Sequence, residues 1–121
     1  MLLDSVIVID HLNGIRAATE FIAHNEREIR LSVITRAEVL AGVDEHGLVP
    51  VTKLLRHFPN LPLAAEDADI AADLRRKYGW KLPDAFQAAL AINHGLKLVT
   101  RNTKDFSPDV HAFVSVPYEL A

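Results

Sequence analysis

Residues 83–106, PDAFQAALAINHGLKLVTRNTKDF, contain a helix, a strand and a polar loop in direct succession. The helix is predicted from about Pro83 to His94, because proline favours the first helical position and Gly95 favours the position just past the end. An apolar strand is predicted at about 97–100, and the stretch after it carries more hydrogen-bonding groups than an ordinary turn needs. A helix that leads directly into an apolar strand is typical of an α/β fold.

The rest of the chain repeats this alternation. Apolar residues at helical spacing predict further helices at about 15–22, 33–41, 51–58 and 66–78, the last with acidic residues in its first turn. Short strands are predicted at about 1–4, 29–31, 61–63 and 113–116. The alternation predicts an α/β fold with a mostly parallel central sheet that helices cover on both faces.

One segment leaves two alternatives open. The run Val6-Ile7-Val8-Ile9 is β-branched, which favours a strand. The residues that follow it, up to Gly14, have the features of a helix end. Propensity alone does not decide between the two.

Composition bounds the class of protein. The length of 121 residues predicts one domain, over 1–121, and an apolar content of 50% excludes global disorder. Cysteine is absent, which removes disulfides and thiolate chemistry and fits a reducing, cytoplasmic environment. No run has the roughly 20 apolar residues of a membrane span, and the N-terminus lacks the features of a secretory signal. General nucleic-acid binders are more often basic than this chain, whose net charge is −3. Solubility alone explains a mildly acidic charge.

Acidic residues recur where the chain turns out of an apolar stretch. These positions are Asp4, Glu38, Asp84 and Asp105. Ligands of open α/β sheets bind outside the carboxyl ends of the strands, so acids from distant parts of the chain would meet there. Acids that meet repel one another, and a hard divalent cation such as Mg²⁺ or Mn²⁺ is the usual reason for a protein to tolerate this.

Each acid also has a structural alternative. Asp4 suits a helix N-cap, and Asp84 suits the first turn of a helix. Glu38 follows Thr35 at the spacing of a capping box, although Ser32 is a second candidate for the cap, which would leave Glu38 a turn and a half inside the helix. The loop up to Asp105 resembles a polar surface turn.

Four sequence blocks, taken together, resemble the PIN domain, and specifically the VapC-type toxin ribonucleases. The blocks are residues 2–14, 32–42, 82–91 and 96–106. Their order and separation carry the resemblance, which covers nearly the whole chain. It implies a three-layer α/β/α fold in which residues 6–13 are helical.

The resemblance also implies roles for individual residues. Asp4, Glu38 and Asp84 would be metal-binding, catalytic acids. Asp105 is favoured for the fourth position, with Asn102 as an indirect or water-mediated ligand. Two further hydroxyl residues, Ser5 and Thr100, would orient ligands or waters. Val6 departs from the family pattern, since this position is often small and polar.

The expected function is therefore that of a Mg²⁺- or Mn²⁺-dependent endoribonuclease, the toxin of a toxin–antitoxin pair. The resemblance further implies an RNA substrate, a cognate antitoxin and a homodimer. Two alternatives stay open. One is a catalytically silent RNA- or protein-binding module on the same fold. The other is a phosphoacceptor receiver domain, which requires adjacent acids after the first strand, whereas Asp4 is followed by Ser5.

Overall fold

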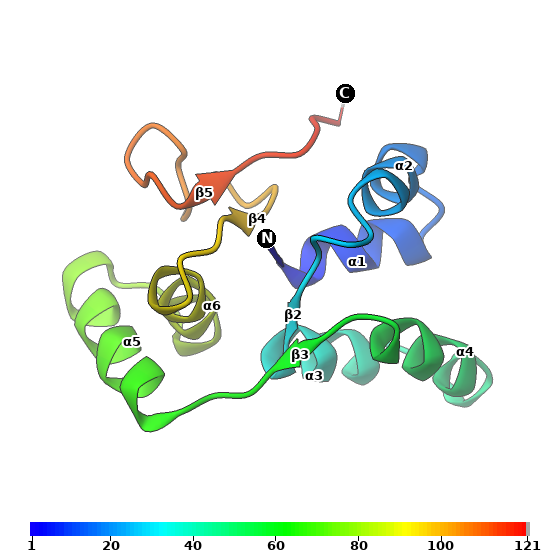
Figure 1. Cartoon of the computed structure of the whole chain (residues 1–121), viewed down its shortest axis with the longest axis horizontal. Coiled ribbons are helices and arrows are strands. Elements are labelled where there is room, and N and C mark those ends of the chain that lie inside the picture. Colours follow the sequence, from blue (N-terminus) through cyan, green and yellow to red (C-terminus); the bar gives the residue numbers. More distant parts are fainter. Residues whose placement is uncertain (121) are drawn as a thin grey trace.

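The computed structural model describes residues 1–120 and consists of short strands that alternate with helices (Figure 1). The strands are β1 (Leu2–Leu3), β2 (Leu31–Ser32), β3 (Asn60–Leu61), β4 (Leu98–Val99) and β5 (Val114–Ser115). The helices are α1 (Ser5–Leu12), α2 (Arg16–His24), α3 (Val33–Ala41), α4 (Glu45–Arg56), α5 (Ala65–Tyr78) and α6 (Leu82–Asn93).

The strands form a parallel arrangement in the order β3-β2-β1-β4-β5. Strand pairs β2–β3, β1–β4 and β4–β5 are all parallel. A parallel bridge between Leu2 and Arg30, with Leu3 N–H donating to the Arg30 carbonyl at 3.0 Å, joins the two halves through β1. The first strand of the chain therefore lies at the centre, and all strands end at one edge.

Helices cover both faces of these strands, so the architecture has three layers. Alternate strand residues point to opposite faces. Leu2 and Leu98 pack into a core with α5 and α6, whereas Leu3 and Val99 pack into a second core with α1 to α4. Figure 1 shows α5 and α6 on one side of the strands and α1 to α4 on the other. The predicted α/β/α fold is confirmed.

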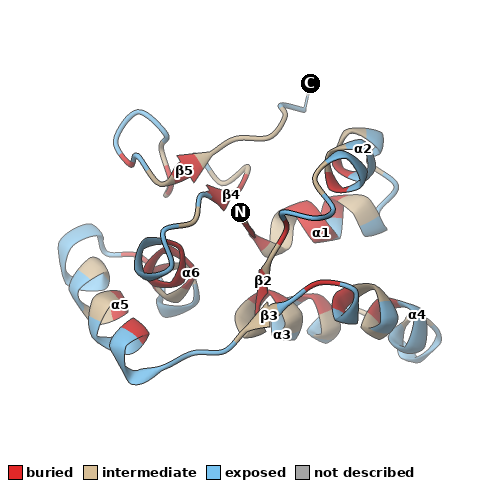
Figure 2. Cartoon of the chain, viewed as in Figure 1, coloured by how far each residue is buried: buried red, intermediate tan, exposed pale blue. Residues whose placement is uncertain are grey.

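Helix α6 is the most deeply buried helix (Figure 2). It packs against α5, which lies outside it and is largely exposed. Alanine has a small side chain and the highest helix propensity, so a helix rich in it can lie close to its neighbours. Close packing fixes the N-terminal end of α6, where Asp84 lies.

Residues 6–9 are helical, as the family resemblance implied and against their β propensity. Asp4 accepts a hydrogen bond from Ser5 N–H and so caps α1 immediately after β1 ends. The helix buries Ile7 and Val8 in the core shared with α2 and α3. Tertiary packing therefore outweighs an intrinsic preference that spans only about 1 kcal/mol.

The third predicted helix, at 51–58, is wrong at its start. The observed helix α4 begins at Glu45, after the Asp44 cap, and passes through Pro50. The exposed side of the helix accommodates this proline, while Val51 and Leu55 bury the opposite side. Helix α5 begins at Ala65, and Glu66 and Asp67 lie in its first turn, as predicted. No helix among residues 1–120 is long and apolar enough to cross a membrane.

Candidate metal centre

Asp4 lies at the carboxyl end of the central strand and is 6% exposed. Its Oδ1 accepts from Ser5 N–H at 2.9 Å, and its Oδ2 accepts from the Thr100 hydroxyl at 2.7 Å. Thr100 is fully buried at the end of β4, so two adjacent strands fix this carboxylate. The cap alternative for Asp4 is correct, and it is compatible with a site, because capping uses only one of its oxygens.

Glu38 lies on α3 and does not cap it. Ser32 is the N-cap, since its Oγ accepts from Thr35 N–H at 3.0 Å, and Thr35 is buried inside the helix. The capping-box alternative for Glu38 is therefore wrong. Crowding by neighbouring groups raises the pKa of the Glu38 carboxyl, chiefly through loss of solvent and then through the negative charges of Asp4 and Asp84, while a hydrogen bond from Ser5 opposes the rise.

Asp84 lies in the first turn of α6, on the same side as Glu38 and Asp4. Partial burial raises the pKa of the Asp84 carboxyl, and the charges of Asp4 and Asp105 raise it further. The ammonium of Lys81 partly offsets this effect. Each of the predicted acids thus lies within electrostatic range of at least one other, although they come from four separate segments.

The loop after β4 supplies Asp105 and holds it by local hydrogen bonds. The Thr100 hydroxyl accepts from Asn102 N–H at 3.0 Å, which shapes the start of the loop. The Asn102 side-chain amide donates to Asp105 Oδ2 at 3.1 Å. In this arrangement Asn102 restrains Asp105.

The donor set suits a hard divalent cation. Burial first, and then the negative charges of neighbouring acids, raise the pKa of both Glu38 and Asp84, and a bound cation would offset both effects. Among residues 1–120, no three acidic or histidine side chains converge into a ready-made ligand cage. Mg²⁺ keeps several of its waters in proteins and binds through one or two carboxylates, so it does not need such a cage.

Sequence reasoning missed a buried polar network beneath Asp4. Gln87, which is 1% exposed, contacts Ser32, Thr35 and Asp4 from α6. Its position three residues after Asp84 was the available signal, because residues three apart share one face of a helix. Without knowledge of which face is buried, that spacing identifies no partner.

A second missed cluster joins α1 to the loop after β4. Arg101 forms a two-pronged ion pair with Asp10, at 2.6 and 2.8 Å, and the Tyr118 hydroxyl donates to the same carboxylate at 2.8 Å. The Arg101 guanidinium, with Tyr118, keeps the pKa of the Asp10 carboxyl below its ordinary value despite burial. Arg101 thus anchors the loop that bears Asn102 and Asp105.

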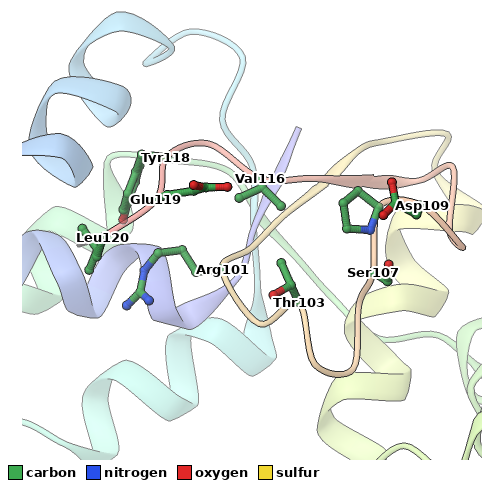
Figure 3. Close-up of a pocket in the computed structure, with 9 residues that line it drawn as sticks. Arg101, Thr103, Ser107, Asp109, Val116, Tyr118, Glu119 and Leu120 are labelled. Carbon is green, nitrogen blue, oxygen red and sulfur yellow. The ribbon is translucent and has the colours of Figure 1, made fainter.

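Two surface depressions flank these clusters. One lies between the loop after β4 and the C-terminal segment and has Arg101, Thr103, Ser107 and Tyr118 among its lining residues (Figure 3). The other is almost entirely apolar and borders the acids. Its lining is Val33, Ile34, Ala37, Glu38, Leu63, Leu82, Pro83 and Phe86.

Comparisons with known proteins agree with this architecture. The ribonuclease VapC19 of Mycobacterium tuberculosis is 33% identical over 113 residues, which cover 87% of this chain and 90% of that protein. Ribonuclease VapC10 of the same organism is 31% identical, with coverage of 88% and 85%. A solved toxin–antitoxin complex from Klebsiella pneumoniae contains a chain that is 35% identical, with a TM-score of 0.88 over 98% of both chains. The family model described as the PIN domain matches residues 1–107. The chain belongs to the PIN domain family.

Proposed function

We propose that this protein is a metal-dependent endoribonuclease and the toxin of a toxin–antitoxin pair. The observation that carries the proposal is the electrostatic coupling of Asp4, Glu38, Asp84 and Asp105 at the carboxyl edge of the parallel strands. The VapC10 and VapC19 relatives are named ribonucleases, which supports RNA as the substrate. Membership of the PIN family excludes the receiver-domain alternative.

Mg²⁺ or Mn²⁺ would be held directly by one or two of these four carboxylates and through its coordinated waters by the others, with Asn102 acting through Asp105. When bound, such an ion lowers the pKa of a coordinated water and offsets negative charge on the scissile phosphate. The chain's own residues orient the ligands: Thr100 donates to Asp4 Oδ2, and the neighbouring Ser5 favours the ionised form of Glu38. The ammonium group of Lys81 lies near Asp84 at the edge of the site, where its positive charge favours an anionic substrate.

The proposed partners are a cognate antitoxin, a second copy of the chain and RNA, in the cytoplasm. The Klebsiella pneumoniae structure is a toxin–antitoxin complex, which supports the first of these. The apolar depression beside Glu38 supports a protein partner next to the site, because exposed apolar patches mark interaction surfaces. A silent binding module on the same fold is the alternative, and the intact set of acids argues against it.

Cleavage of a fluorogenic RNA, with Mg²⁺ or Mn²⁺ and with EDTA, tests the proposal. Wild type should cleave only with the metal, and Asp4→Asn and Asp84→Asn should each lose most of this activity. Asp69→Asn is the matched control, because it makes the same change at an exposed position of α5. Identical purification of all four proteins excludes a contaminating nuclease. Wild-type rates in both site variants would refute the metal centre.

A further inference from the structure

The buried amide of Gln87 connects three of the segments that carry the acids. Gln87 lies one turn after Asp84 on α6, and Thr35 lies one turn before Glu38 on α3. Gln87 Nε2 lies 2.6 Å from Thr35 Oγ1 and 3.4 Å from Asp4 Oδ1, while Gln87 Oε1 lies 2.6 Å from Ser32 Oγ. Ser32, Thr35 and Gln87 are each at most 1% exposed, so water does not substitute for these partners.

The hydrogen-bond donors around Gln87 leave its amide one orientation. Ser32 Oγ accepts from Thr35 N–H, and its own proton donates to Gln87 Oε1 at 2.6 Å, because the other acceptor within reach, Thr35 Oγ1, lies at 3.4 Å. Thr35 donates its hydroxyl proton to the Leu3 carbonyl at 3.1 Å, so Thr35 Oγ1 must accept from Gln87 Nε2. The second N–H of that amide therefore faces Asp4 Oδ1.

This orientation makes the two oxygens of Asp4 inequivalent. A carboxylate has about four lone-pair sites, two on each oxygen. Both sites on Oδ1 face donors, Ser5 N–H and the Gln87 amide. Oδ2 accepts from Thr100 alone, so one site on Oδ2 stays open.

We propose that Gln87 is a positioning residue that leaves Asp4 only its Oδ2 for a metal ion and thereby favours Mg²⁺ or Mn²⁺ over Ca²⁺. Mg²⁺ requires near-ideal octahedral geometry, which a single oxygen of each carboxylate satisfies, whereas Ca²⁺ takes six to eight oxygens and accepts two from one carboxylate. Because the Gln87 amide donates to Asp4 Oδ1, this second oxygen of Asp4 is not available to the metal ion. The inference rests on the proposed function, since it requires Asp4 to be a metal ligand.

Calorimetric titration with Mn²⁺ and with Ca²⁺, in the absence of RNA, tests the proposal. Gln87→Met keeps the length of the side chain and removes both amide groups. We expect the ratio of the Ca²⁺ to the Mn²⁺ dissociation constant to fall about tenfold, the size of effect usual for residues that orient a metal ligand. Leu55→Ala is the control, because it weakens the core from α4, a helix that carries none of the proposed site residues, and its ratio should match that of wild type.

Each result of this experiment decides the matter. An unchanged ratio in a folded Gln87→Met protein overturns the role of Gln87 and leaves the metal centre intact. A wild type that binds neither ion removes the metal centre and this inference together. If Gln87→Met does not fold, Ser32→Gly decides, because glycine retains most of the capping stability and removes the donor that orients the amide. For Ser32→Gly, the ratio of the Ca²⁺ to the Mn²⁺ dissociation constant should fall about threefold, which is less than the fall expected when the whole amide is removed. An unchanged ratio overturns the proposal.

Discussion

The ion pair between Asp10 and Arg101 should be a main contributor to stability, and Asp10→Asn tests this. The change keeps the shape of the side chain and removes the charge that accepts two bonds from Arg101 and one from Tyr118. Loss of one partner of a buried pair costs about 3–5 kcal/mol. Because the side chain of Arg101 is 27% exposed and that of Asp10 is 9% exposed, the lower end of this range, about 3 kcal/mol, applies.

Chemical and thermal denaturation measure this cost. For a domain of this length, about 3 kcal/mol corresponds to a fall in Tm of about 12 °C. Tyr118→Phe removes one hydrogen bond to a charged acceptor and should cost about 1.5 kcal/mol. Asp69→Asn, at an exposed position, is the control and should lie within about 0.5 kcal/mol of wild type.

The dependence on pH gives a second, independent check. The folded state lowers the pKa of Asp10 below its ordinary 3.8, so the folded form binds this proton more weakly than the unfolded form. The stabilisation is therefore complete above about pH 4 and is lost as the pH falls through the lowered value. The difference between wild type and Asp10→Asn should narrow over that range. A variant within about 0.5 kcal/mol of wild type at pH 7 would refute the reasoning.

Three further predictions concern the acids and the assembly. Glu38→Gln should lose most metal-dependent RNA cleavage, while its free energy of unfolding should stay within about 1 kcal/mol of wild type. Glu66→Gln, on the exposed side of α5, is the control. A fully active Glu38→Gln protein would show that Glu38 is not part of the site. Because the folded state raises the pKa of Glu38 and Asp84, the metal-free protein should gain stability as the pH falls from 7 towards the ordinary values of 4.5 and 3.8, and denaturation of Glu38→Gln should show a weaker gain. Sedimentation at micromolar concentration should show a homodimer, and a monomer would contradict that prediction.

The sequence predicted the layers because they depend on the regular alternation of helices and strands. Apolar residues at helical intervals predict that α3 is a helix, but not that it buries Thr35 and Val39. Acids that follow apolar strands lie near one edge because parallel strands end there. The helical state of residues 6–9 was not predictable from propensity, because burial of Ile7 and Val8 decides it. The early start of α4 was hidden by Pro50, which ends most helical patterns but lies here on the solvent side.

The hydrogen-bond partners of Asp4 and Asp10 could not be predicted from the sequence for a different reason. Gln87 and Arg101 are separated from them by 83 and 91 residues, and no local pattern records which distant side chain completes a hydrogen bond. A single sequence supplies residue types and spacing, while such contacts depend on how two helices and a loop pack. The geometry around Gln87 therefore emerges only once all three segments are placed.

The central position of β1 has a consequence for synthesis of the protein. Translation produces β1 before the other strands, yet its neighbour β4 and the hydroxyl of Thr100 follow only after more than 90 further residues. Domains form as units during synthesis, at about 5–20 residues per second. A nascent chain that stops before residue 98 would expose an unpaired edge of β1 and lack the Thr100 hydroxyl that holds Asp4 Oδ2. We therefore expect a prematurely terminated chain to aggregate or be degraded.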